Sequence, residues 1–120
     1  MNKIIFSWVI LIFYMSLIFY FSSQEKIAFL DKKPFSYIKI FKDKILHIIE
    51  YFVLVFLTQN AFKTNKFLNK NLFLYSILFS TLYGISDEFH QLFVFGRYFS
   101  IFDMLADFIG SCLILITKLF

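Results

Sequence analysis

Long apolar runs separated by short polar segments are the feature that most restricts how this chain can fold. The first run, 4–21, carries no charged residue, and a helix of that length reaches roughly 27 Å, about the thickness of a bilayer's hydrocarbon core. Three further runs cover about 45–62, 72–92 and 101–119. The chain is 60% hydrophobic, above the roughly half that is usual for a soluble domain. The sequence therefore predicts an all-α membrane protein, an antiparallel bundle of four transmembrane helices that forms a single domain over 1–120.

The first run has a competing interpretation as a secretory signal. A signal has a shorter apolar region that is followed by a small-x-small cleavage site. Phe21, Ser22 and Ser23 match such a site poorly. We therefore expect the first run to be retained as a membrane span.

The polar segment before the second run allows two interpretations. Between residues 35 and 45, apolar Ile38, Phe41 and Ile45 recur among lysines. This spacing suits a short helix that lies in the membrane interface, with its lysines reaching headgroup phosphates. A solvated loop that leads into the next helix fits the same residues.

Four spans place both chain termini on one side of the membrane and bring three span ends together on the other. These are the start of the second span, the end of the third and the start of the fourth. The polar residues expected to converge there are Asp43, His47, Glu50, Asp87, Glu88, His90, Arg97 and Asp103. Lysine and arginine are too evenly divided between the two sides for the positive-inside rule to fix the orientation.

Small residues recur at helical spacing in the third and fourth runs. Ser76, Ser80 and Gly84 fall four residues apart, and Ala106 and Gly110 repeat that spacing. Small residues allow two helices in a membrane to approach closely. We expect both stripes to be helix-packing surfaces.

Ionisable residues inside the second and third runs are the main candidates for chemistry, because such residues are costly in a membrane. Asp43, His47, Glu50 and Tyr51 share one helical face of the second run. This face is either a functional site or a polar clamp between helices.

In the third run, Tyr83, Asp87 and Gln91 share a face, and Glu88 adjoins it. Two adjacent carboxylates repel each other, so one retains a proton at neutral pH unless a cation lies nearby. Such a pair suits acid–base chemistry, a proton relay or a cation site. Arg97 is the expected neutralising partner, and its guanidinium also suits a phosphate or carboxylate ligand. A buried ion-pair network between helices is the structural alternative.

The fourth run begins with a pattern that explains one of its two acids. Ser100 and Asp103 match a capping box, with Phe99 and Met104 placed as a hydrophobic staple. Asp107 lies a full turn deeper and needs a proton or a partner. His47, Glu50 and Arg97 are the expected partners.

Several classes of function are not supported by the sequence. The net charge is +4, but the lysines form no single basic patch of the kind that binds nucleic acid. Cys112 is the only cysteine, so one chain can form neither a disulfide nor a cysteine metal cluster. Conceivable metal ligands lack HxxxH or HExxH spacing, and we predict no metal and no cofactor; they are His47, Glu50, Glu88 and His90.

Taken in order, the polar residues resemble the motifs of the VanZ-like family of membrane proteins. The resemblance covers nearly the whole chain and also includes Ser22-Ser23-Gln24. Phe95 departs from the proline that commonly precedes Gly-Arg, and Asp107 from a common asparagine. The matching residues are Asp43, Lys44, His47, Glu50, Tyr51, Tyr83, Gly84, Asp87, Glu88, Gln91, Gly96, Arg97 and Asp103.

The family takes its name from a protein linked to glycopeptide resistance, notably to teicoplanin. The resemblance implies a multi-pass protein of the bacterial cytoplasmic membrane with a role in the cell envelope. The expected partners are the lipid bilayer and an envelope lipid or glycopeptide. The expected ligand-binding residues are Asp43, Lys44, His47, Glu50, Tyr51, Asp87, Glu88, Gln91, Arg97, Asp103 and Asp107.

Three hypotheses of function follow. The first is a binding or resistance factor for an envelope lipid or a lipid-tailed glycopeptide. The second is a small membrane enzyme that acts on a lipid-linked phosphate or sugar, with Glu88 or His47 as general base and Asp87 as a further catalytic candidate. The third is a proton-coupled transporter or a structural partner.

Overall fold

The computed structural model describes residues 2–22, 37–94 and 101–119, and only the backbone of 37–43. The described residues form helices and turns without a β-strand, which confirms the all-α class. The helices are α1 (Lys3–Ser22), α2 (Tyr37–Phe62), α3 (Lys66–Asn69), α4 (Leu72–Gln91) and α5 (Ile101–Cys112), followed by the 3₁₀ helix η2 (Leu113–Leu119).

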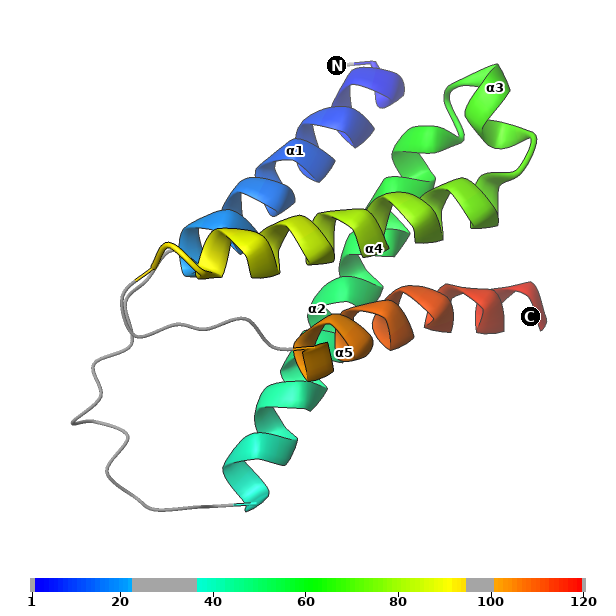
Figure 1. Cartoon of the computed structure of the whole chain (residues 1–120). Coiled ribbons are helices and arrows are strands. Elements are labelled where there is room, and N and C mark those ends of the chain that lie inside the picture. Colours follow the sequence, from blue (N-terminus) through cyan, green and yellow to red (C-terminus); the bar gives the residue numbers. More distant parts are fainter. Residues whose placement is uncertain (1, 23–36, 95–100, 120) are drawn as a thin grey trace.

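Three helices form the centre of the fold. α2, α4 and α5 each pack against the other two, and α1 lies on α2 and α4. Figure 1 shows that α1, α2, α4 and α5 run in alternating directions. The end of α1, the start of α2, the end of α4 and the start of α5 therefore lie toward the same side of the molecule (Figure 1).

Two helix boundaries differ from the prediction. Residues 37–44 are helical and continuous with the second run, so the solvated-loop interpretation is wrong for them. The fourth run is not one α-helix over 101–119, because α5 ends at Cys112 and the chain continues as η2. The β-branched residues of η2 favour the α-helix less than leucine does, and the Thr117 hydroxyl donates to the Ile114 carbonyl at 2.6 Å.

By length and composition, two helices could cross a membrane. They are Lys3–Ser22, with a mean hydropathy of 2.3, and Lys44–Phe62, with 1.5. α4 has 20 residues but includes Asp87 and Glu88, and α5 has only 12 residues. These properties support two of the four predicted spans directly.

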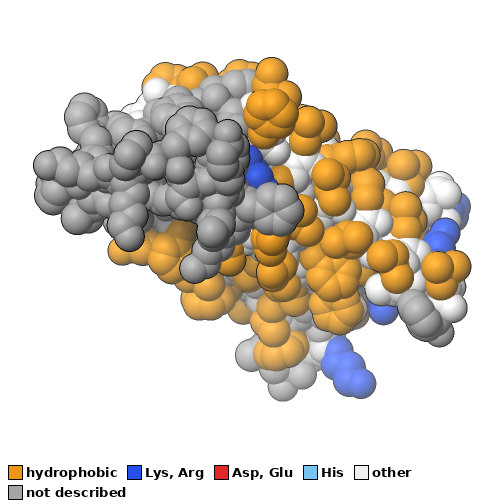
Figure 2. Space-filling model, turned by 90° about the horizontal axis from the view of Figure 1, so that it is seen from below, with side chains coloured by type: hydrophobic (Ala, Val, Ile, Leu, Met, Phe, Trp, Pro, Cys, Tyr) orange, Lys and Arg blue, Asp and Glu red, His pale blue; other side chains and the backbone are white. Residues whose placement is uncertain are grey.

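The outer surface is strongly apolar, while the buried interior is partly polar. On α1, Phe6 is 52% exposed and Phe13 64% exposed, although both are large hydrophobic residues. Figure 2 shows hydrophobic side chains spread over most of the described part of one face. Exposed apolar surface of this extent is typical of a face that contacts lipid or another protein.

The predicted small-residue stripes lie at helix contacts, which confirms the packing prediction. Ser76, Ser80 and Gly84 are buried along α4, and Ala106 and Gly110 are buried along α5. A Cβ atom on Gly110 would lie 2.3 Å from the carbonyl oxygen of Ile48. Only glycine therefore allows the backbone of α5 to approach α2 this closely.

Candidate functional site

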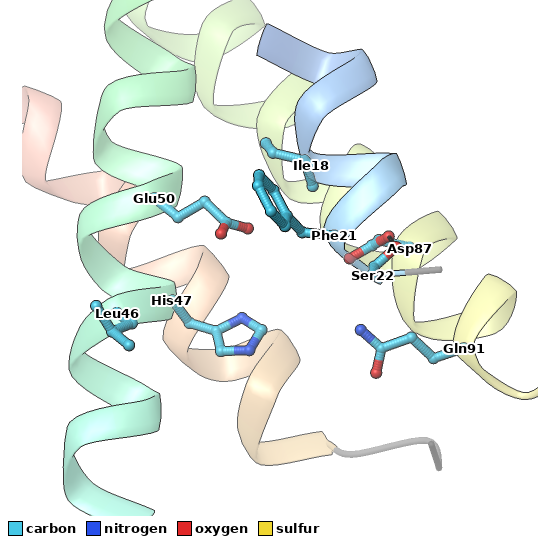
Figure 3. Close-up of a pocket in the computed structure, with 8 residues that line it drawn as sticks. All are labelled: Ile18, Phe21, Ser22, Leu46, His47, Glu50, Asp87 and Gln91. Atoms are coloured by element: carbon cyan, nitrogen blue, oxygen red, sulfur yellow. Dashed lines mark hydrogen bonds between the residues drawn. The ribbon is translucent and has the colours of Figure 1, made fainter. Parts of the chain in front are cut away.

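Polar side chains from three helices meet around a pocket of about 170 Å³ near the end of α1 (Figure 3). The pocket has a polar lining with an apolar edge. Its lining residues are Ile18, Phe21 and Ser22 of α1, Leu46, His47 and Glu50 of α2, and Asp87 and Gln91 of α4.

The predicted polar face of α2 is divided between this pocket and the core. His47 and Glu50 line the pocket, being three residues apart on the helix. Tyr51 is fully buried and points into the core instead. The face was predicted from spacing alone, which cannot distinguish a pocket wall from a neighbouring helix contact.

His47 connects the pocket to α5. Its Nδ1 lies 2.9 Å from Oδ1 of Asp107, and its Nε2 lies 3.8 Å from Oδ2 of Asp103. Asp107 is 1% exposed, so the hydrogen bond to His47 offsets part of the cost of burying this carboxylate. His47 is one of the three partners that the sequence suggested for Asp107, and this expectation is confirmed.

Asp103 joins α5 to α2 through an ion pair with Lys44. Asp103 is buried and Lys44 is partly exposed. The Asp103 side chain therefore makes a contact between helices, which the capping interpretation did not include. The capping partners Ser100 and Phe99 lie outside the described residues.

Ser22 and His90 form a second polar cluster with Asp87. The Ser22 hydroxyl donates to Oδ1 of Asp87 at 2.6 Å, and Nδ1 of His90 lies 3.4 Å from the same hydroxyl. The His90 ring also stacks on Phe19, with centroids 4.3 Å apart. This cluster links the last turn of α1 to the last turns of α4.

Sequence reasoning did not place Ser22 or His90 among the ligand-binding residues. The signal that could have found Ser22 was its position, because the first span ends on the side where the other polar residues converge. His90 was recognised as part of the polar stretch and as a conceivable metal ligand, but no spacing assigned it a partner. Its contacts with Phe19 and Ser22 come from helix packing.

The adjacent acids of α4 point to different surroundings. Asp87 lines the pocket, whereas Glu88 is fully buried and is not part of the lining. Successive residues of a helix point about 100° apart, so the two carboxylates need not share one site. Gln91, one turn after Asp87, is also buried and lines the pocket.

A three-helix contact lies directly behind the pocket. A Cβ atom on Gly84 would lie 2.9 Å from Oδ2 of Asp107 and 3.1 Å from Cε2 of Tyr51. Glycine at this position therefore lets α2 and α5 both approach α4. The contact places Asp107 between His47 on one side and Gly84 on the other.

Two of the predicted site residues lie wholly or partly outside the described part of the chain. Arg97 lies outside the described residues, and only the backbone of Asp43 is described. The pairing of Arg97 with Asp87 and Glu88 therefore stays a prediction. Among the described residues, no group of three His, Cys, Asp or Glu side chains is arranged to hold a metal ion.

The pocket combines a small volume with side chains that can form hydrogen bonds. A volume of about 170 Å³ is below the roughly 300–1,000 Å³ of sites for drug-sized ligands, so the pocket has the size for a small chemical group. A histidine that is hydrogen-bonded to a buried carboxylate is suited to accept a proton. Ser22 and Gln91 add hydrogen-bonding groups to the same lining.

Helices with an apolar exterior, close glycine contacts and buried acids, as in the described residues, are typical of a membrane-associated protein. The VanZ/LLP1 family model matches residues 5–120, and the chain belongs to this family. No curated protein and no solved structure matches the chain.

Proposed function

We propose that the chain is a single domain that crosses the bacterial cytoplasmic membrane with four antiparallel spans. α4 supports this proposal by the direction of its side chains: Asp87 and Glu88 are buried, while Leu74 and Leu82 are more than half exposed. α5 follows the same pattern, with Asp107 buried and apolar residues outside. The polar residues that lower the hydropathy of both helices therefore face away from lipid.

The pocket is the proposed binding site for the headgroup of an envelope lipid or of a lipid-tailed ligand. The observation that carries this proposal is the mixed lining of the pocket. Asp87 and His47 provide polar contacts, while Phe21 and Leu46 are apolar, 61% and 55% exposed, and lie at its edge. A ligand with a small polar head and an apolar tail matches both parts.

In the cell, this binding would serve the envelope and lower susceptibility to teicoplanin. Membership of the VanZ/LLP1 family supports an envelope role. A lipid-tailed glycopeptide and an envelope lipid share the chemistry that the pocket suits, namely a polar group next to a hydrocarbon chain.

A lipid-retention experiment tests the proposal. The purified protein is incubated with a bacterial envelope-lipid extract, washed, and examined by native mass spectrometry. We expect wild type to retain defined lipids, and Asp87→Asn to retain them at least about tenfold less, as expected when a hydrogen bond to a charged group is lost. Ser86→Ala is the matched control, because this serine lies on the exposed side of α4.

Teicoplanin susceptibility is then compared for cells that carry the same variants at equal membrane abundance. Wild type and Ser86→Ala should protect, and Asp87→Asn should not. Equal lipid retention by wild type and Asp87→Asn would contradict the binding site, whatever the susceptibility.

A membrane enzyme is the second candidate, and the His47–Asp107 hydrogen bond favours it. With Nδ1 held at 2.9 Å from Asp107, Nε2 of His47 can act as general base toward a group in the pocket. His47→Gln should then abolish turnover of a lipid-linked phosphate or sugar while lipid retention persists. Envelope-lipid profiles that are identical in a deletion strain and in the wild-type complement would rule out this reaction.

A further inference from the structure

Buried polar atoms continue beyond the pocket into the interface of α2, α4 and α5. Five of them have no hydrogen-bond partner among the described residues, although their residues are at most 1% exposed. Burying a hydroxyl or carboxylate oxygen without a partner is costly, and polar interiors are usually satisfied by protein or by bound water. The atoms are Oη of Tyr51, Oγ of Ser76, Oγ of Ser80, Oδ2 of Asp107 and Oγ of Ser111.

Four of these atoms belong to buried residues of α4 and α5 and form a column between the two helices, and the Tyr51 hydroxyl comes from α2. The two helices run in opposite directions, and Gly84 contacts Asp107. One turn further along the pair, Ser80 and Ser111 therefore face each other, and Ser76 follows another turn on. From Gln91 at the pocket to Ser76, α4 rises about 22 Å, which is most of the thickness of a bilayer's hydrocarbon core.

Asp107 joins this column to the pocket. Its Oδ1 is hydrogen-bonded to His47, which lines the pocket. Its Oδ2 lies against Gly84, where the column begins. The aromatic ring of Tyr51 contacts the same glycine position. The column thus begins where the pocket ends.

We propose that the column holds a chain of bound water and carries protons between the pocket and the opposite end of α4 through His47 and Asp107. Hydroxyl groups both donate and accept hydrogen bonds, so water between them can satisfy the partnerless oxygens and transmit a proton. Chains of Asp, Glu and His inside membrane spans are the usual elements of proton relays. This inference goes beyond ligand binding, because the column lies outside the pocket lining.

The transfer needs only N–H and O–H bonds to break and form. Neutral His47 carries its proton on Nδ1 and takes up a second proton from the pocket on Nε2. The Nδ1 proton passes to Oδ1 of Asp107, which leaves neutral His47 and a neutral carboxylic acid. After the carboxyl group rotates, its proton passes to a bound water, which releases one of its own protons to the next oxygen. Water in the pocket then accepts the Nε2 proton and donates a proton to Nδ1, which restores the first tautomer without a net change in protons.

The charged groups around Asp107 limit where protons can reside. His47 and Tyr51 face it from α2, Asp87 from α4, and Asp103 precedes it by one turn of α5. Ser80 and Ser111, further along the column, carry no charge. A proton that leaves Asp107 therefore moves along hydroxyl groups and water rather than to another carboxylate on that side.

Proton flux through the purified full chain in liposomes tests the proposal. A potassium gradient with valinomycin sets the membrane potential, and a trapped pH-sensitive dye reports the flux. We expect wild type to exceed protein-free vesicles, and Asp107→Asn to lower the protein-dependent flux by about 100-fold, as for loss of a proton-transferring group. Ser80→Ala should also lower it, whereas Ser86→Ala, an exposed serine on the same helix, should match wild type.

Size-exclusion chromatography and helical circular dichroism confirm that each variant is folded. If Asp107→Asn does not fold, Tyr51→Phe and Ser111→Ala take its place, because each removes one hydroxyl. Folded wild type with no more flux than protein-free vesicles would overturn the proposal. Flux that is unchanged in every folded column variant would do the same. Lipid retention in the pocket is measured separately, so failure of the relay and failure of the proposed binding site are distinguishable.

Discussion

At the scale of single residues, Gly84 is the position on which the site geometry most depends. Oδ2 of Asp107 and the ring of Tyr51 both lie within about van der Waals distance of the place where a Cβ atom would be. Without that space, Asp107 could not lie between His47 and α4. The position of Asp107 behind the pocket and the close packing of three helices therefore both depend on Gly84.

Gly84→Ala should destabilise the protein by about 1–3 kcal/mol, the usual cost of overpacking. The added Cβ meets Asp107 at 2.9 Å, and this side chain cannot move without disturbing its hydrogen bond to His47. Thermal unfolding in detergent measures the effect. Gly110→Ala is the matched comparison and should lower the unfolding temperature more, because its Cβ would lie 2.3 Å from the backbone of Ile48. Unfolding of Gly84→Ala at the wild-type temperature would contradict the described contact.

Residue spacing and topology predicted much of the candidate site, but they could not supply distances. Reversal of direction between successive helices predicts that His47, Asp87 and Asp103 lie on one side of the molecule. Spacing could not show that the Asp87 side chain lines the pocket while the Glu88 side chain does not, because this depends on which neighbouring helix each one faces. Ser22 was overlooked as a site residue for a related reason: a single serine becomes informative only when its contact with Asp87 is known.

At the scale of helices, hydropathy predicted which segments are helical better than it predicted the residues at which the helices begin and end. α1 and α4 match their predicted runs closely, because long apolar runs fix a helix strongly. The early start of α2 and the 3₁₀ ending after Cys112 are helix boundaries, which hydropathy does not determine. The fold of the last run therefore could not be predicted from its length alone.

α1 is attached through Leu11 and Ile18, which belong to the hydrophobic core, and through two side-chain hydrogen bonds. The Tyr14 hydroxyl donates to the Glu50 carbonyl at 2.8 Å, and the Tyr83 hydroxyl donates to the Met15 carbonyl at 2.6 Å. Both bonds lie near the middle of α1. They hold the helix that supplies Ile18, Phe21 and Ser22 to the pocket.

Tyr83→Phe should loosen α1 by about 1 kcal/mol, the net value of a typical hydrogen bond. Hydrogen–deuterium exchange should become faster in α1 while it stays unchanged in α5, which Tyr83 does not anchor. Tyr75→Phe is the matched control on the same helix, because its ring stacks on Phe67 and the substitution keeps that ring. Equal exchange of α1 in wild type and Tyr83→Phe would contradict the anchoring role.

At the scale of the whole molecule, apolar side chains face outward and acids face inward, the reverse of a soluble protein. Phe93, at the pocket end of α4, is 86% exposed, whereas Asp107 at the centre is 1% exposed. This arrangement lowers the cost of placing polar helices in a bilayer, because lipid contacts only their apolar sides. It also explains why hydropathy alone supports only two of the four proposed spans.

The four-span proposal makes a direct prediction of sidedness. Asn2, Lys66 and Phe93 are exposed in the structure. In a Cys112→Ser background, each is replaced in turn by a single cysteine, which is labelled with a membrane-impermeant maleimide. Asn2 and Lys66 should react from one side of sealed vesicles and Phe93 only from the other, because α1 and α2 form one crossing pair and α4 crosses alone. If Phe93 reacts from the same side as Lys66, α4 does not cross the membrane. The polar column would then lie along a helix that does not cross the bilayer, and protons could not pass through it from one side of the vesicle membrane to the other.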